Sequence, residues 1–262
     1  MIKMMMKVAL PIAVSLFALN AVAETPEEHG LRIAKEGDAR DLGFGDVTAN
    51  MMMTLKNRAG QTSTRKIRSK TLEGKSDGDK SLSLFDTPAD VKGTSMLTFS
   101  HGLKADDQWL YLPALKRVKR INSRNKSGPF MGSEFAFEDL GSQEVEKYKY
   151  KYLREEACGK GWKCHVIERT PAYKYSGYSK QIVWVDTKEY RNTKVEFYDR
   201  KGSKMKTLTS TGYKQFLGKY WRPTTMSMQN HLTGKSTVLQ WTNYKFRTGL
   251  TARDFNKNAL SR

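Results

Sequence analysis

Alternation of apolar and polar residues runs through most of the chain after Gly45 and constrains its fold more than any other feature. Successive side chains of a strand point to opposite faces of a sheet, so a period of two predicts strands. About thirteen short segments follow this pattern, separated by turns such as Asn57–Gly60 and Thr233–Lys235. No helical pattern lies between them, which excludes a fold of alternating strands and helices. The sequence therefore predicts a mainly β protein, an antiparallel barrel or sandwich.

One helix is expected before the strands, over residues 25–40. Thr25 is a suitable N-cap, Pro26 suits the first helical position, and Glu27 and Glu28 suit the first turn, where the helix dipole favours acids. A modest apolar stripe that includes Ile33 follows. These signals predict a single amphipathic helix in front of the strands.

The first 23 residues have the pattern of a secretory signal peptide. Lys3 and Lys7 precede an apolar run over 8–19, and Ala21-Val22-Ala23 offers a small-x-small cleavage site. A buried helix or a membrane anchor fits less well, because the apolar run is short for an anchor. We therefore expect an exported protein that is cleaved after Ala23.

The charge of the chain is strongly positive, at +19 over 262 residues. Loss of Lys3 and Lys7 with the signal peptide would leave +17. Such a charge favours an anionic partner or surface, but export argues against a nucleic-acid role in the cytoplasm. No internal stretch approaches the ~20 apolar residues of a membrane span, which excludes a polytopic membrane protein.

The two cysteines, Cys158 and Cys164, enclose five residues, two of which are glycine. In an oxidising compartment a close pair predicts a disulfide. A redox pair normally has two intervening residues, and a metal site would need further ligands. We therefore expect a structural disulfide that staples a hairpin.

Large apolar side chains recur on single faces of the expected strands. Methionine is flexible and polarizable, and suits surfaces that accept varied apolar ligands. Ordinary core packing is the alternative for each of these residues. The candidates for the lining of a lipid-binding cavity are Met51, Met53, Leu97, Phe99, Trp109, Tyr111, Trp184, Phe197, Met226, Met228 and Trp241.

One connection between strands is unusually apolar. It carries Phe130, Met131, Phe135 and Phe137 in a stretch that begins with glycine and proline. Exposed connections are normally polar. We therefore expect this segment to act as a plug or lid at the barrel mouth, or else to form a hydrophobic contact surface.

A basic strand precedes that connection, with Lys116, Arg117, Lys119 and Arg120 in five positions. No acidic residue occurs between Gln108 and Ser133. The strand is either a solvated face or a docking patch for anionic lipid headgroups or an acidic partner.

No catalytic constellation is present in the sequence. The four histidines do not form a metal-binding pair on a helix. The segment Thr233–Ser236 ends like a phosphate-binding loop, but Gln229 stands where that loop requires glycine. We expect a protein that is not an enzyme and has no cofactor or metal.

Several longer motifs resemble a known family. They are Lys70–Gly74, Asp77–Ser81, Asp107–Ile121, Ser127–Phe135, Lys194–Asp199, Lys219–Pro223 and Phe246–Leu250. Together they resemble the outer-membrane lipoprotein-sorting protein-like (LolA-like) family of Gram-negative periplasmic proteins. The resemblance covers nearly the whole chain after the signal peptide.

The resemblance implies a single domain over residues 24–262. Its fold would be an incomplete, strongly curved antiparallel β-barrel closed by a few short helices. It also implies a periplasmic carrier that holds lipid or lipidated protein in a hydrophobic cavity and moves it towards the outer membrane. Some members accompany RND-type transporters in the inner membrane, so the alternative is an accessory or scaffold protein of such a transporter, without lipid cargo of its own.

Overall fold

The computed structural model describes residues 23–75 and 77–261. The signal peptide expected over residues 1–23 lies outside this range, apart from Ala23. The described part is built from one helix, fifteen strands and seven short 3₁₀ helices. In this part no helix is long and apolar enough to cross a membrane.

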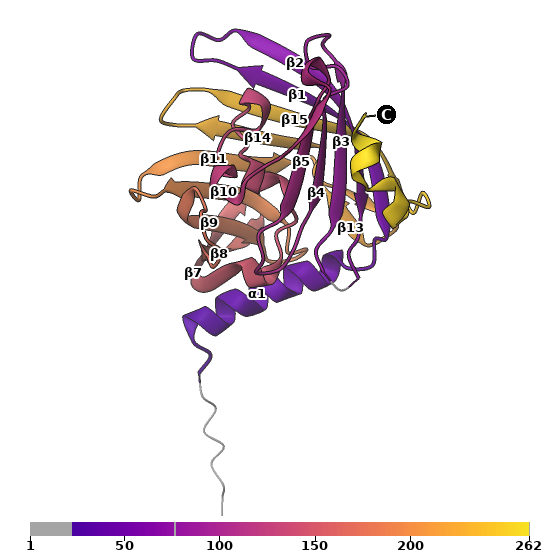
Figure 1. Cartoon of the computed structure of the whole chain (residues 1–262). Coiled ribbons are helices and arrows are strands. Elements are labelled where there is room, and N and C mark those ends of the chain that lie inside the picture. Colours follow the sequence, from indigo (N-terminus) through magenta and orange to yellow (C-terminus); the bar gives the residue numbers. More distant parts are fainter. Residues whose placement is uncertain (1–22, 76, 262) are drawn as a thin grey trace, which may run out of the picture.

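Thirteen strands form one antiparallel sheet (Figure 1). Six of them precede the long connection: β1 Asp46–Lys56, β2 Thr62–Leu72, β3 Lys80–Thr87, β4 Ser95–Phe99, β5 Asp107–Leu112 and β6 Arg117–Arg120. Seven follow it: β7 Tyr148–Gly159, β8 Trp162–Pro171, β9 Tyr178–Asp186, β10 Asn192–Asp199, β11 Lys204–Thr211, β14 Thr225–Asn230 and β15 Ser236–Phe246.

The sheet order shows how the barrel stays open. The strands lie in the order β6-β5-β4-β3-β2-β1-β15-β14-β11-β10-β9-β8-β7. Two meanders therefore meet where β1 pairs with β15, as in the pair Met51↔Trp241. The strands β6 and β7 remain as unpaired edges, and the sheet curves so that β3–β5 lie in front of the other strands (Figure 1). The expected incomplete, curved antiparallel barrel is confirmed.

A small hairpin lies outside this sheet. It pairs β12 (Lys214–Phe216) with β13 (Tyr220–Arg222). The alternation predicts a single strand over 220–229, but the structure divides it. Pro223 separates β13 from β14, because proline cannot donate a ladder hydrogen bond.

Helix α1 (Pro26–Asp41) forms where the sequence predicts it. The Thr25 hydroxyl accepts a hydrogen bond from the Glu28 amide, and the Glu28 carboxylate accepts one from the Thr25 amide. This capping box satisfies two backbone donors at the helix start. The helix runs along one end of the curved sheet (Figure 1).

The connection between the two edges of the sheet contains most of the 3₁₀ helices. After η1 (Pro113–Leu115), which joins β5 to β6, the chain passes from β6 to β7. On the way it forms η2 Ser123–Asn125, η3 Phe130–Gly132, η4 Phe137–Leu140 and η5 Val145–Lys147. We call residues 121–147 the crossing segment, since they pass from one edge of the sheet to the other.

The C-terminal residues cover part of the outer face of the sheet. They form η6 (Ala252–Asp254) and η7 (Lys257–Ser261). Phe255 and Leu260 are buried against the outer side chains of β3, β4 and β5. The Ser95 hydroxyl donates a buried hydrogen bond of 2.6 Å to the carbonyl of Leu260. The sheet therefore has apolar residues packed on both faces.

This double packing corrects part of the expected cavity lining. Leu97, Phe99, Trp109 and Tyr111 pack beneath the C-terminal residues and not in the interior. Trp184 lies in a separate outer cluster with Cys164. On β4 and β5 the interior positions belong instead to Met96 and Leu110. Alternation grouped these residues correctly by face, but it does not tell which face is inside.

The disulfide between Cys158 and Cys164 is confirmed. It joins the ends of the β7–β8 hairpin, which turns at Lys160 and Gly161. Cys164 is fully buried, whereas the neighbouring Trp162 is about half exposed.

Candidate functional site

The apolar part of the crossing segment packs into the interior of the sheet. Phe130 is 2% exposed and Phe135 is 4% exposed, and Met131 and Phe137 pack partly buried against the same cluster. The Phe130 ring lies 5.8 Å from the ring of Phe85 on β3 and 5.6 Å from that of Phe137. This segment fills part of the space that the curved sheet encloses.

One buried ion pair joins the segment to β11, one of the strands that follow it in the chain. The Lys206 ammonium on β11 lies 3.0 Å from the Asp139 carboxylate, and both side chains are nearly buried. Asp139 also accepts a hydrogen bond of 2.9 Å from the Tyr178 hydroxyl. Lys206 donates a second hydrogen bond to the carbonyl of Glu134. Breaking such a pair on one side would leave a buried charge.

The adjacent carboxylate of Glu138 is anchored to the β8–β9 turn. It accepts hydrogen bonds from the Ser176 hydroxyl (2.8 Å), the Gly177 amide (2.8 Å) and the Tyr173 hydroxyl (3.0 Å). Burial, with the nearby charge of Asp139, raises its pKa above the usual range of a glutamate.

Strands β2 and β5, which precede the segment in the chain, bind its backbone carbonyls. Arg65 on β2 donates a hydrogen bond of 2.5 Å to the carbonyl of Met131. Gln108 on β5 donates one of 2.8 Å to the carbonyl of Phe137. Strands from both halves of the open barrel therefore form hydrogen bonds with the crossing segment.

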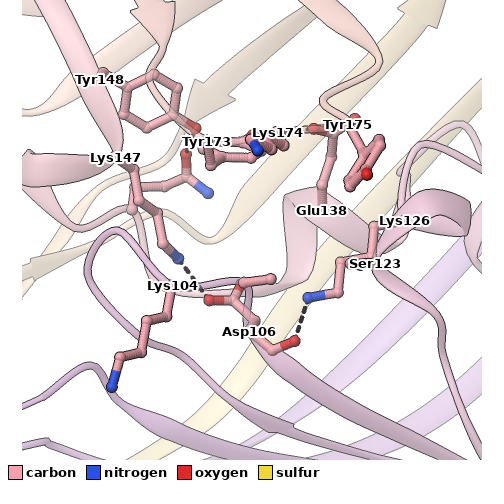
Figure 2. A pocket seen from close by; sticks show the side chains of 12 residues that line it. Lys104, Asp106, Ser123, Lys126, Glu138, Lys147, Tyr148, Tyr173, Lys174 and Tyr175 are labelled. Carbon is pink, nitrogen blue, oxygen red and sulfur yellow. Dashed lines mark hydrogen bonds and ion pairs between the residues drawn. The ribbon is translucent and has the colours of Figure 1, made fainter.

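A buried ion pair joins the β4–β5 loop to η5, which immediately precedes β7 (Figure 2). Asp106 accepts a 2.9 Å ion-pair hydrogen bond from Lys147, and its carbonyl accepts one from Lys126. The Lys147 and Asp106 side chains are both less than 10% exposed. The cavity beside them holds only about 30 Å³, roughly the share of one water molecule in the liquid. This cluster is suited to hold the chain together rather than to bind a ligand.

The larger opening is a groove between α1 and the strands, which we call the α1 groove. Its volume is about 620 Å³, within the range of ligand pockets. Its apolar lining consists of Ile33, Ala34, Leu42, Phe44, Val47, Val145, Tyr150, Ile167, Val183, Val185, Tyr190, Tyr213, Trp221, Pro223 and Met226. Burial raises the pKa of the Tyr150 hydroxyl, which keeps it neutral.

The α1 groove is open because α1 faces the sheet with small side chains. Gly30 lies directly on β7, where an added Cβ would lie 2.8 Å from the backbone of Lys151 and Tyr152. Ala34 and Gly37, one and two turns further along, line the groove. Ile33 is the one large side chain that the helix buries. Small residues bring the helix close and still leave space beneath it.

Charged residues surround the apolar floor. The acidic part of the lining, which we call the acidic rim, consists of the carboxylates of Asp38, Asp41, Glu73, Asp77, Asp79, Glu144 and Glu189. The cations of the lining are those of Arg40, Arg169, Arg191, Lys219 and Arg222, of which Arg222 pairs with Asp41 and the buried Arg191 pairs with Asp186. A lining with both apolar and charged side chains is chemically suited to an amphipathic ligand.

Two carboxylates of the acidic rim are held in place by backbone amides. Glu73 accepts hydrogen bonds from the amides of Gly43 (2.5 Å) and Gly45 (2.6 Å) at the end of α1. Asp79 accepts one from the Gly74 amide. Burial, together with the neighbouring charges of Glu144 and Glu73, raises the pKa of Asp79 to about 6.

The expected cavity residues divide into two groups. Met51, Met53, Phe197, Met226, Met228 and Trp241 belong to the interior cluster. Of these, only Met226 lines the α1 groove. The five residues corrected above lie on the outer face.

The sequence alone did not single out the small residues of α1 or the arginines that line the groove. The spacing of Gly30, Ala34 and Gly37 at i, i+4 and i+7 was the available signal, since it places three small residues on one helix face.

The basic strand is exposed along its whole length, but its cations do not share one face. Arg117 and Lys119 pair with interior-facing residues of β5, whereas Arg120 pairs with the outer-facing Trp109. Lys116 precedes the strand at the end of η1. Arg120 also forms an ion pair with Asp107.

No group of three or more potential metal ligands occurs among residues 23–75 and 77–261. The described contacts of the groove include no hydrogen-bonded pair of nucleophile and base.

Comparisons with known proteins agree with this architecture. A family model described only as "uncharacterized protein"-like matches residues 77–262. No curated protein matches the sequence. A structure from Vibrio parahaemolyticus, described as an outer-membrane lipoprotein-sorting protein domain, is 59% identical, with a TM-score of 0.88 over 90% of this chain and 100% of that one.

Two further structures are similar. A DUF1329 family protein from Desulfovibrio piger is 33% identical, with a TM-score of 0.85 over 90% of this chain and 99% of that one. A LolA superfamily protein from Nitrosomonas europaea shares the fold at 21% identity, with a TM-score of 0.71 over 88% of this chain and 98% of that one. The chain therefore belongs to the outer-membrane lipoprotein-sorting protein-like (LolA-like) family.

Proposed function

We propose that this protein is an exported periplasmic carrier that binds lipid or lipidated protein and moves it across the envelope towards the outer membrane. The observation that carries the proposal is the α1 groove, with its apolar floor and 620 Å³ of space in a LolA-like sheet. The description of the Vibrio relative as a lipoprotein-sorting protein domain supports the same cargo class.

The physical basis is burial of an acyl chain. Each methylene removed from water contributes about 0.8 kcal/mol, so a chain of ordinary length gains on the order of ten kcal/mol before ordering costs. The half-buried Val47, Val145 and Met226 supply such a surface, and the charged side chains of the lining would face the polar headgroup. Binding of this kind needs no cofactor, metal or catalytic residue.

In this proposal the apolar residues of the crossing segment act as a plug. Phe130, Met131, Phe135 and Phe137 would keep the rest of the interior dry and confine the ligand to the α1 groove. Their buried polar anchors, above all the Lys206–Asp139 pair, favour a fixed plug over a lid that swings away.

The proposal can be tested by uptake of an environment-sensitive fluorescent fatty acid. Ala34→Trp would place a large side chain in the α1 groove and is expected to weaken binding by about tenfold or more, which corresponds to about 1.4 kcal/mol. Ala39→Trp is the matched control, because Ala39 lies on the exposed face of the same helix. No uptake by the wild type, or equal loss in both variants, would contradict a groove site.

The second candidate is an accessory or scaffold protein of an RND-type transporter, without lipid cargo. The observation that favours it is the interior already filled by the chain's own segment, with Phe130 and Phe135 buried. Mass spectrometry of lipid extracted from protein purified from the periplasm separates the two. Copurified lipid supports the carrier, and its absence together with failed uptake supports the scaffold.

In either function the basic residues Lys116, Arg117, Lys119 and Arg120 would serve docking. Charge reversal at Lys116 and Lys119 should then weaken binding to an anionic partner or surface, and the loss should shrink at high salt. Unchanged binding at low salt would make the strand a solvated face only.

A further inference from the structure

The open sheet has two edges, and the molecule treats them differently. On β7, α1 contacts residues from both faces of the strand. His29 stacks on Tyr152, which points inward, and Glu27 lies 3.7 Å from Lys151, which points outward. A helix that reaches both faces of a strand lies over its edge. Covering an edge in this way prevents pairing with other chains.

The β6 edge has no such cover among the described residues. All four residues of β6 are exposed, and β6 pairs with β5 alone. Val118 is 41% exposed and the preceding Leu115 is 62% exposed.

The pairing register shows which backbone groups are free. The Ile121 amide donates to the carbonyl of Gln108 at 2.8 Å, next to the pair Arg120↔Trp109. Along an antiparallel pair, residues whose backbone groups bond to the neighbouring strand alternate with residues whose backbone groups point away from it. The N–H and C=O groups of Val118 and Arg120 therefore point away from the sheet, ready to pair with another strand.

The charge at this edge selects the partner. Lys116, Arg117 and Lys119 form no ion pair with any residue that the structure describes. No acidic residue lies between Gln108 and Ser133 to neutralise them. Three uncompensated cations around free backbone groups favour an extended segment that carries carboxylates.

The placement of the cations distinguishes a peptide from a membrane. Arg117 and Lys119 are on the inner face of the strand and Arg120 is on the outer face. Of the β6 cations, a membrane against the outer face would meet Arg120 alone, which already pairs with Asp107. An added strand presents side chains to both faces, so its inner carboxylates would pair with Arg117 and Lys119.

We propose that the β6 edge binds an extended acidic segment of a partner protein, which joins the sheet as a fourteenth strand. Backbone hydrogen bonds to Val118 and Arg120 supply the affinity, and the flanking cations supply the preference for acidic side chains. This inference is independent of what the α1 groove binds.

The experiment uses an eight-residue peptide of alternating glutamate and threonine, and a control peptide with lysine in place of glutamate. We expect the acidic peptide to bind at low salt, to slow hydrogen exchange at the amides of Val118 and Arg120, and to lose affinity as salt rises. The lysine peptide should not bind. Peptide binding without protection of these two amides would overturn the proposal.

Val118→Pro removes one outward donor and leaves the pairing to β5 intact, so it should weaken the acidic peptide roughly fivefold, the effect of about 1 kcal/mol. Lys119→Glu should weaken it at low salt and much less at high salt. If Val118→Pro does not fold, the exchange measurement on the wild type decides. Vesicles of phosphatidylglycerol form the third arm. Binding to vesicles but not to the acidic peptide would show a membrane-docking strand and would also overturn the proposal.

Discussion

The same curved sheet builds two regions of the interior in opposite ways. In the plugged region, Phe130 and Phe135 fill the space. Asp139 forms an ion pair with Lys206 of β11 and a hydrogen bond with Tyr178 of β9. In the α1 groove, the helix presents Ala34 and Gly37, and about 620 Å³ remains open.

The difference teaches that the size of the covering side chains, more than the strands themselves, decides whether such a sheet encloses a core or a site. The strands supply apolar residues to both regions, such as Phe197 to the plugged one and Val183 to the groove. Where the cover brings large side chains with buried polar anchors, the interior is filled. Where the cover is a helix with small residues, space remains.

The largest effect is expected from the anchor of the plug. Lys206→Met leaves the Asp139 carboxylate buried without its cation and should lower the free energy of unfolding by about 3–5 kcal/mol. Denaturant unfolding measures it. Lys204→Met on the same strand is the control, since Lys204 is exposed and its pair with Glu196 is partly solvated. Equal losses in the two variants would contradict a special role for the buried pair.

The next effect concerns the plug itself. Phe130→Ala and Phe135→Ala should each lower the free energy of unfolding by about 3 kcal/mol, because each ring is fully packed. A fixed plug predicts that the remaining folded protein takes up a fluorescent fatty acid as the wild type does. A lid predicts that uptake and release change more than the melting temperature. The second result would contradict a fixed plug and show that the segment acts as a lid.

Much of the fold could be predicted from the sequence, for identifiable reasons. Thr25, Pro26 and Glu28 predict the start of α1, because capping is local chemistry. Cys158 and Cys164 predict their own disulfide, because few residues separate them. The strands follow from alternation, and most of them form close to their expected ranges.

The sites were harder to predict, because they depend on contacts between distant segments. Trp109 and Trp184 alternate like interior residues, but the C-terminal residues and an outer cluster cover them from the other side. The α1 groove depends on how closely Gly30 approaches β7, which no local pattern encodes. The apolar residues of the crossing segment stand out in the sequence, but its anchors Lys206 and Tyr178 lie far along the chain.

A pH experiment tests the acidic rim of the groove. The pKa of Asp79 is about 6 in the folded protein and near its ordinary value of 3.8 when unfolded. Between these values the folded state holds a proton that the unfolded chain has lost, so this group lowers stability as pH rises from about 4 to 6. Asp79→Asn should remove the penalty and raise the free energy of unfolding at pH 7.5 by about 2–3 kcal/mol.

At pH 4 the same variant should match the wild type, since Asp79 is then protonated in the folded state and costs little. A gain of the same size at both pH values, or none at pH 7.5, would contradict a buried carboxylate with a raised pKa. Denaturant unfolding at the two pH values provides the measurement.

The smallest effects separate the two glycines of α1. Gly30→Ala places a Cβ 2.8 Å from the β7 backbone and should destabilise the protein by about 1–2 kcal/mol, despite the better helix propensity of alanine. Gly37→Ala meets the Tyr190 carbonyl at 3.4 Å and should gain roughly 0.5 kcal/mol from propensity. Thermal unfolding distinguishes them, and the same sign for both would contradict a close approach at Gly30 alone.

The most direct test of the groove is to map where an acyl chain binds. A fatty acid with a diazirine near its terminal carbon can be photolysed on the purified protein, and the labelled peptides identified by mass spectrometry. A site in the α1 groove predicts saturable labelling around Val47, Val145 and Met226, which competing unlabelled fatty acid removes. Labelling confined to Phe130–Phe137, or no saturable labelling, would contradict it.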